Sequence, residues 1–167
     1  MKKILAIDPS GNFVEGKGKT GFALLTLDDD GNSINFGTIK AENFDKRSDY
    51  WQDVGVLIGV ETPDVLIIED YRLYNTRATS AGVQSFSLLE TPRLLGVLEV
   101  VAEANSLEIV WQMATQTKPY SDDKLLKLDI LKKEKGRYYF RGKQVNDHER
   151  SALRHLLRYT DKERIIW

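Results

Sequence analysis

The sequence contains no cysteine, so neither a disulfide framework nor a thiolate metal site is available to it. It also lacks a long apolar run, because the first apolar stretch turns polar at Asp8, far short of a signal-peptide core or a membrane span. These two absences predict a cytoplasmic protein without a membrane segment. Internal repeats, low-complexity tracts, a Walker phosphate loop, a zinc-binding pattern and a Ser/His/Asp nucleophile motif are missing as well.

Charge is unevenly distributed along the 167 residues, although the net charge is only −1. Residues 1–117 contain 10 Lys and Arg against 17 Asp and Glu, whereas residues 118–167 contain 14 against 8. The whole chain is therefore not a basic nucleic-acid protein, but its last third could supply a surface that faces phosphates. A solvated charged face explains the same asymmetry.

The pattern of apolar residues predicts a single mixed α/β domain over residues 1–167, with helices packed on a central sheet. Thr91 and Pro92 are expected to restart a helix, as its N-cap and first residue. The expected elements are an antiparallel meander of strands at 2–8, 20–27 and 33–40, a helix at 46–61, a buried strand at 64–69, helical residues at 81–105, a strand at 107–113, a helix at 121–133, a charged connection at 133–143 and a last helix at 147–158.

Two carboxylates stand where apolar strands end. Asp8 follows one apolar run and Glu69 follows another. If both strands are central and parallel, the two side chains leave the sheet at the same edge, where they repel unless a proton or cation lies between them. Mg²⁺ or Mn²⁺ is the natural counter-charge for an all-oxygen site. Alternatively, Asp8 only starts a turn, and Glu69 or Asp70 caps the following loop.

The expected last helix carries the third candidate group. Its apolar stripe consists of Ala152, Leu153, Leu156 and Leu157. At about 100° per residue, one flank of that stripe carries His148, Ser151 and His155, with Asp147 beside Ser151. If this flank faces the sheet edge, Asp147 or His148 completes a carboxylate-rich metal site. Such a site suits phosphodiester hydrolysis, in which one metal activates water and another stabilises the leaving oxygen.

The start of the same helix has a purely structural interpretation. Asn146 followed by Glu149 three residues later resembles a capping box, in which each side chain satisfies the other's backbone N–H. From the local pattern alone, capping is the stronger interpretation of these residues.

At these positions the chain resembles the RuvC family of Holliday junction resolvases, especially small phage-encoded members. The matching segments are Ile4-Leu5-Ala6-Ile7-Asp8-Pro9-Ser10-Gly11, Thr20-Gly21-Phe22-Ala23, Pro63-Asp64-Val65-Leu66-Ile67-Ile68-Glu69 and Asp147-His148 with Ala152-Leu153-Arg154-His155. The resemblance implies an RNase H-like α/β fold with a mixed five-stranded sheet flanked by helices. It also implies a homodimer that uses Mg²⁺ to nick opposite strands of branched DNA, in recombination and repair.

Carried over by motif, Asp8 is the first-strand metal ligand and Glu69 the fourth-strand ligand. The last helix of the family usually supplies Asp or His and then Asp three residues later, which here correspond to His148 and Ser151. Ser151 is a departure, because a hydroxyl cannot replace the charge of a carboxylate. Either a neighbouring carboxylate substitutes for it, or activity is weakened, or the chain carries an inactivating change.

Helical geometry favours Asp147 over Glu149 as the substitute, because Asp147 shares a face with Ser151. The predicted catalytic set is therefore Asp8, Glu69, Asp147 and His148, with the metal held by Asp8, Glu69 and Asp147.

Basic residues follow the carboxyl ends of the proposed parallel strands and are predicted to contact DNA phosphates. They are Lys17, Lys19, Arg72, Arg77, Lys118 and Lys124. Tyr71, Tyr74 and Phe86 are candidates for stacking on unpaired bases. For each residue alone, a solvated charge or a half-buried ring is the favoured interpretation.

Three other functions remain open from the sequence. An actin-like or sugar-kinase nucleotide-binding lobe begins in a similar way but normally needs a second lobe. A junction-binding protein that kept the fold and lost one ligand is consistent with Ser151. A less selective nuclease of the same fold, acting on flaps, forks or RNA–DNA hybrids, shares every predicted ligand.

Overall fold

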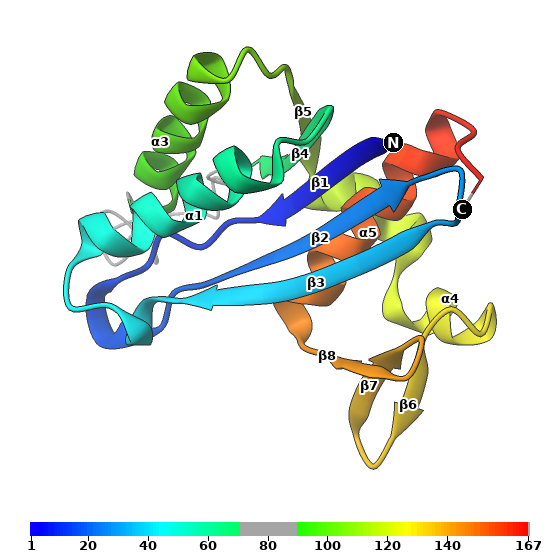
Figure 1. Cartoon of the computed structure of the whole chain (residues 1–167). Coiled ribbons are helices and arrows are strands. Elements are labelled where there is room, and N and C mark those ends of the chain that lie inside the picture. Colours follow the sequence, from blue (N-terminus) through cyan, green and yellow to red (C-terminus); the bar gives the residue numbers. More distant parts are fainter. Residues whose placement is uncertain (71–89, 167) are drawn as a thin grey trace.

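The centre of the protein is a five-stranded sheet, seen in a computed structural model that describes residues 1–70 and 90–166 (Figure 1). Its strands lie in the order β3-β2-β1-β4-β5. The first three strands form the predicted antiparallel meander, and β4 and β5 run parallel to β1. The strands are β1 (Lys2–Asp8), β2 (Lys19–Leu27), β3 (Ser33–Lys40), β4 (Val65–Asp70) and β5 (Ile109–Met113).

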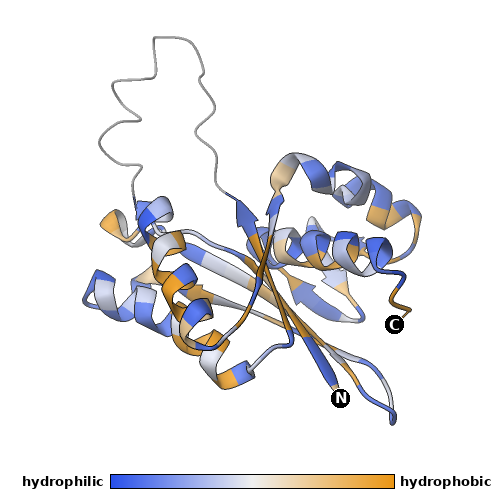
Figure 2. Cartoon of the chain, turned by 90° about the horizontal axis from the view of Figure 1, so that it is seen from above, coloured by the Kyte–Doolittle hydropathy of each residue, from blue (hydrophilic) through white to orange (hydrophobic). Residues whose placement is uncertain are grey.

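Helices cover both faces of this sheet. One face packs against α1 (Arg47–Glu61) and α3 (Glu90–Ala104), and the other packs against α5 (Asp147–Lys162). The central strands are therefore apolar on both sides, which explains why their sequences are continuous apolar runs. Seen from above, the hydrophobic central strands lie between the helices of the two faces (Figure 2).

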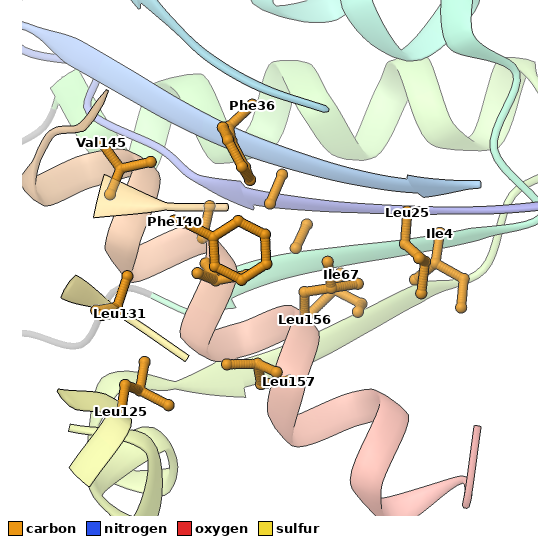
Figure 3. Close-up of a cluster of buried hydrophobic side chains, with 14 residues drawn as sticks. Ile4, Leu25, Phe36, Ile67, Leu125, Leu131, Phe140, Val145, Leu156 and Leu157 are labelled. Carbon is orange, nitrogen blue, oxygen red and sulfur yellow. The ribbon is translucent and has the colours of Figure 1, made fainter. Parts of the chain in front are cut away.

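Strand alternation divides the buried side chains between two clusters. Ile4 and Ile67 point toward α5 and pack with Leu156, whereas Leu5 and Ile68 point toward α1 and α3. All five of these side chains are fully buried. The α5 cluster is drawn in Figure 3 and extends to Phe36, Leu125, Leu131, Phe140 and Val145. This packing fixes α5 across the strands whose ends carry the predicted carboxylates.

The segment between β5 and α5 differs from the prediction. The helix expected at 121–133 is wrong beyond α4 (Asp122–Lys127), because the chain turns at Asp129, whose φ of 56° is left-handed. The connection expected at 133–143 is instead a three-stranded antiparallel sheet. Its strands are β6 (Lys132–Glu134), β7 (Arg137–Phe140) and β8 (Lys143–Val145). We call residues 132–145 the small sheet.

Two tight turns form the small sheet. Lys135 and Gly136 have φ of 47° and 78°, and Arg141 and Gly142 have φ of 47° and 80°. Positive φ at both central residues is the signature of type I′ turns, whose twist matches that of the strands they join. Short 3-10 helices complete the chain at η1 (Val14–Gly16), η2 (Ala41–Asn43) and η3 (Ala114–Tyr120).

The predicted helix at 46–61 is confirmed, and the last helix extends four residues beyond its expected end, to Lys162. Thr91 and Pro92 lie in the first turn of α3, where the missing N–H of proline costs no hydrogen bond. Residues 81–89 of the expected helix lie outside the described residues. Within the described part of the chain, none of the helices has both the length and the apolar character needed to cross a membrane.

Candidate active site

Asp8 and Glu69 occupy the same edge of the sheet. β1 and β4 are parallel neighbours with Ile7 opposite Ile68, so these two carboxylates follow at the next position of each strand. Both accept hydrogen bonds from side chains of α5, which places them on the same face. Burial raises the pKa of Asp8, and the nearby negative charge of Glu69 raises it further, against the lowering effect of a hydrogen bond from His148.

His148, in the first turn of α5, lies over Asp8. Its Nδ1 is 3.0 Å from Oδ2 of Asp8, and the imidazole remains 35% exposed. This hydrogen bond is the main reason that the pKa of His148 is raised, against the opposing effect of partial burial. The positive charge of Lys19 acts in the lowering direction on the same pKa. A carboxylate and an imidazole thus share one partly open position at the sheet edge.

The close approach of α5 to the sheet depends on Gly21. Gly21 lies opposite Asp8 in the β1–β2 register. A Cβ at Gly21 would be 2.3 Å from the carbonyl carbon of His148 and 2.7 Å from its Cβ. Any other residue would therefore push the first turn of α5 away from Asp8. This explains physically why a glycine occupies the second predicted motif.

Glu69 is held by two donors from the next turns of α5. Ser151 Oγ donates to its Oε2 at 3.0 Å, and His155 Nε2 lies 2.9 Å from the same oxygen. Burial alone would raise the pKa of Glu69, but the hydrogen bonds and charge of His155, together with the Ser151 hydroxyl, hold it below its usual value. Glu69 is therefore kept ionised inside a half-buried site.

His155 is itself fully buried and bridges two neighbouring strands. Its Nδ1 is 3.1 Å from Oε1 of Gln112, which lies opposite Glu69 in the β4–β5 register. The sequence placed His148, Ser151 and His155 on one flank of the helix, and the structure confirms that this flank faces the sheet edge. The role of His155 was missed, although its spacing of seven residues from His148 was the available signal.

The start of α5 is fixed by the predicted capping box. Asn146 Oδ1 accepts from the backbone N–H of Glu149 at 3.0 Å, and Glu149 Oε2 accepts from the N–H of Asn146 at 2.9 Å. Thr38 of β3 joins this pair, because it accepts from Asn146 Nδ2 at 2.7 Å and donates to Glu149 Oε1 at 3.2 Å. Glu149 is therefore engaged in capping rather than in replacing a metal ligand.

The structure does not bring Asp147 together with the other predicted ligands. Its side chain is 90% exposed, and its Oδ1 is 3.8 Å from Nη1 of Arg150. One residue along a helix corresponds to a rotation of about 100°, so the neighbour of an inward-facing His148 points to the rim. His148, not Asp147, is the side chain of this turn that contacts Asp8.

The loop that follows Asp8 is anchored by α1 and α3. Glu90 is 7% exposed, and its carboxylate accepts from the N–H of Phe13 at 2.8 Å and lies 2.8 Å from Nε of Arg47. The Tyr50 hydroxyl donates to the carbonyl of Ser10 at 2.6 Å. Sequence reasoning did not identify Glu90, because nothing in its local pattern distinguishes it from a solvated helical glutamate.

The predicted DNA-contacting lysines that can be placed are all exposed. Lys17 and Lys19 lie at the end of this loop and the start of β2, and Lys118 and Lys124 lie in η3 and α4. Arg72, Arg77, Tyr71, Tyr74 and Phe86 lie outside the described residues.

The donor set at the edge fits a divalent cation in its chemistry. Asp8 and Glu69 meet α5 at one edge of the sheet, the negative charge of Glu69 raises the pKa of Asp8, and His148 lies 3.0 Å from Asp8. Mg²⁺ and Mn²⁺ prefer such oxygen-rich surroundings. Among the residues that the structure describes, no three His, Cys, Asp or Glu side chains already converge as a metal site. Asp8, Glu69 and His148 are the residues that would hold such an ion.

Comparison with known structures identifies the fold. Neither the protein-family models nor the curated proteins include a match to this sequence. The chain is similar to T. thermophilus RuvC in complex with Holliday junction substrate, with a TM-score of 0.67 and 12% identity over 99% of this chain and 96% of that chain. A second Thermus thermophilus RuvC structure gives a TM-score of 0.64 and 11% identity over 98% and 96%. The chain has the RuvC fold.

The expected RNase H-like architecture is thereby confirmed, with its mixed five-stranded sheet flanked by helices. At this level of identity the similarity to RuvC concerns the fold alone, so the function rests on the side chains at the sheet edge.

Proposed function

We propose that this protein is a metal-dependent endonuclease that cleaves branched DNA, such as Holliday junctions, by phosphodiester hydrolysis. The observation that carries the proposal is the meeting of Asp8 and Glu69 at one sheet edge, beneath His148 of α5. T. thermophilus RuvC, which has the same fold, is in complex with Holliday junction substrate in its structure, and this supports the choice of substrate. Mg²⁺ is the proposed cofactor, with Mn²⁺ as a substitute.

Each side chain has a separate role in this proposal. Asp8, Glu69 and His148 hold the cation, which when bound activates water and neutralises charge on the phosphate. Ser151 and His155 orient Glu69 and keep it ionised through their contacts with its Oε2. Asp147, first predicted as a ligand, is assigned to the exposed rim of the site.

The phosphate contacts are proposed on the same edge. Lys19 is the best supported of them, because it is exposed at the start of β2, two residues before Gly21, which lies against the backbone of His148. Lys17, Lys118 and Lys124, with Arg72 and Arg77 from outside the described residues, are proposed to frame the junction and to give affinity without reading sequence.

A homodimer is part of the proposal, because two sites related by a two-fold axis suit paired nicks in a four-way junction. Val56 and Val60 of α1 and Val100 of α3 are exposed at 46%, 70% and 66%, and these two helices pack together. A second copy covering these valines would bury them. Sedimentation of the free protein tests this: a dimer that Val60→Lys and Val100→Lys dissociate supports the interface, and a monomer at all concentrations excludes it.

The function is tested by incubating the purified protein with a synthetic four-way junction, with Mg²⁺ or with a chelator. Paired nicks that need Mg²⁺, with linear duplex left uncut, support the proposal. Equal cutting of flaps, forks or RNA–DNA hybrids indicates the less selective nuclease. The second candidate, a junction-binding protein without catalysis, is favoured by Ser151, and tight junction binding without cleavage in either metal would establish it.

A further inference from the structure

The small sheet concentrates positive charge on a protruding part of the molecule. Residues 132–143 contain six Lys and Arg and one acidic residue, although the whole chain has a net charge of −1. In Figure 1 the small sheet extends away from the five-stranded sheet, beside the start of α5. The cationic residues, all exposed, are Lys132, Lys133, Lys135, Arg137, Arg141 and Lys143.

The inner side of the small sheet is anchored to the core. Phe140 is 3% exposed, and its ring meets that of Phe36 edge-on with centroids 5.3 Å apart. Lys143 Nζ donates to the carbonyl of Phe36 at 2.9 Å. These contacts hold the charged strands in a defined position, unlike a solvated basic tail.

Arg150 of α5 ties the small sheet to the helix of the candidate site. Its guanidinium lies 4.0 Å from the centroid of the Tyr138 ring, and its Nε donates to Asp122 Oδ2 at 3.0 Å. β8 ends at Val145, three residues before His148. A molecule bound to the small sheet is therefore held in a fixed relation to the side chain that contacts Asp8.

The strand register assigns the two faces. Lys133, Tyr138 and Val145 lie opposite one another, and this row faces the core because Val145 is 3% exposed. The alternate row, Lys132, Tyr139 and Gln144, lies on the outward face. Ammonium, hydroxyl and amide donors on one outward row, next to the basic turn at Lys135, suit the phosphate oxygens of a nucleic-acid backbone.

We infer that the small sheet binds the phosphate backbone of a DNA duplex arm and positions that arm relative to the site at Asp8 and Glu69. The inference rests on the proposed function, and it adds a contact surface that lies apart from the loops at the sheet edge. Duplex DNA is favoured over a protein partner because the surface offers several cations and hydrogen-bond donors with almost no acidic or exposed apolar residue among them.

The test is a DNA-binding titration in chelator, so that cutting plays no part. The variant Lys132→Gln/Lys135→Gln/Arg137→Gln is compared with the wild type by fluorescence anisotropy, on linear duplex and on a four-way junction, across about 50–200 mM salt. Lys143 and Arg150 are left intact because they anchor the sheet. The matched control, Lys2→Gln/Lys162→Gln/Arg164→Gln, removes the same charge at exposed positions near the other ends of β1 and α5.

The small-sheet variant should weaken duplex binding at least about ten-fold and make the logarithmic salt dependence shallower by about 0.9 per lost phosphate contact. The control should leave the slope unchanged, and both variants should keep the wild-type melting temperature. Equal slopes for the wild type and the small-sheet variant overturn the inference even if junctions are cut. The inference is also overturned if both variants lose the same amount of duplex affinity, or if the wild type does not bind DNA. A shallower salt dependence of DNA binding in the small-sheet variant alone supports the inference. If no junction is cleaved in that case, only the proposed function fails.

Discussion

His155 Nε2 lies 2.9 Å from Oε2 of Glu69, and the imidazole that makes this contact is fully buried. The pair joins the strand that supplies a carboxylate to the helix that covers it. The other histidine of α5, His148, makes the corresponding contact to Asp8, but its side chain is 35% exposed. The two histidines therefore differ in burial while serving the same edge of the sheet.

Replacing each histidine by leucine should separate stability from cleavage. His155→Leu removes the buried partner of Gln112 and one of the two donors to Glu69. It should cost about 1–3 kcal/mol of unfolding free energy, because unsatisfied buried polar groups are penalised. His148→Leu should change stability by about 1 kcal/mol or less, as expected for a partly exposed contact, but abolish cleavage. Urea unfolding and single-turnover cleavage measure both effects. Equal stability losses in the two variants would contradict the assigned roles, and His155→Gln should recover part of the loss.

Asp8→Asn should abolish cleavage while preserving or tightening junction binding. The substitution removes a ligand of the proposed cation and an anion that lies near the phosphates. Because burial raises the pKa of Asp8, its ionised form is disfavoured in the folded protein, and the amide should also raise the urea midpoint at neutral pH without metal. Unchanged cutting by this variant excludes the proposed site.

Ser151→Asp should strengthen metal binding. The hydroxyl is 3.0 Å from Glu69, so a carboxylate there adds negative charge beside an existing one. In chelator the variant should melt at a lower temperature than the wild type, because two carboxylates lie side by side. At the same concentration of Mg²⁺ or Mn²⁺ its melting temperature should rise more, because a ligand at concentration L that binds only the folded state stabilises it by RT ln(1 + L/Kd) and the variant has the lower Kd. The control is Asp147→Asn, which should leave the metal-induced shift unchanged because Asp147 faces Arg150. If Asp147→Asn removes the metal-induced rise in melting temperature, Asp147 is a metal ligand after all.

Gly21→Ala should disrupt the site by displacing the first turn of α5. The added Cβ would meet the backbone of His148 at 2.3 Å, and overpacking of this kind typically costs about 1–3 kcal/mol. Cleavage should fall far more than stability, because the first turn of α5 must move away from Asp8. Gly59→Ala is the matched control at an exposed position of α1, where nothing lies within 4 Å of the new Cβ. The unfolding free energy of Gly59→Ala should rise by about 0.5–1 kcal/mol, and this variant should keep its activity.

Stability should fall in acid partly through Glu69. Its pKa is lowered in the folded protein, so the stabilising contribution of its ionised form is fully present above its ordinary value of 4.5 and is lost as pH falls through the lower folded value. Glu69→Gln should make the unfolding free energy less dependent on pH in this range. Urea unfolding between about pH 3 and 6, compared with Asp64→Asn as an exposed control, measures the difference. If the unfolding free energy of Glu69→Gln depends on pH as steeply as that of the wild type, the low pKa of Glu69 does not contribute to acid stability.

The main elements were predictable because each has a strong periodic signal. The apolar runs before Asp8 and Glu69 are typical of central strands, and the stripe beginning at Ala152 is typical of a helix that covers them. Parallel pairing of β1 and β4 then follows from the fold, and with it the meeting of the two carboxylates. This much of the site was available from the sequence.

The rest depended on information that local patterns do not contain. The small sheet was missed because its strands are three to four residues long and highly charged, and because Lys135-Gly136 and Arg141-Gly142 are weaker turn signals than Asn-Gly. Asp147 was favoured on helical geometry, because it lies four residues before Ser151 on the same face of the helix. In the structure its neighbour His148 faces inward, and a rotation of about 100° leaves Asp147 at the exposed rim.

The contact between Asp8 and His148 spans 140 positions of the chain. During synthesis on a ribosome, the first strands and their carboxylates emerge long before α5, and nothing made earlier can take the place of its imidazoles. A polypeptide interrupted ahead of β8 would carry both acids without their helical cover. Under the proposed function, the ability to cut DNA therefore arises only once translation has passed the final helix, and truncated copies lack it.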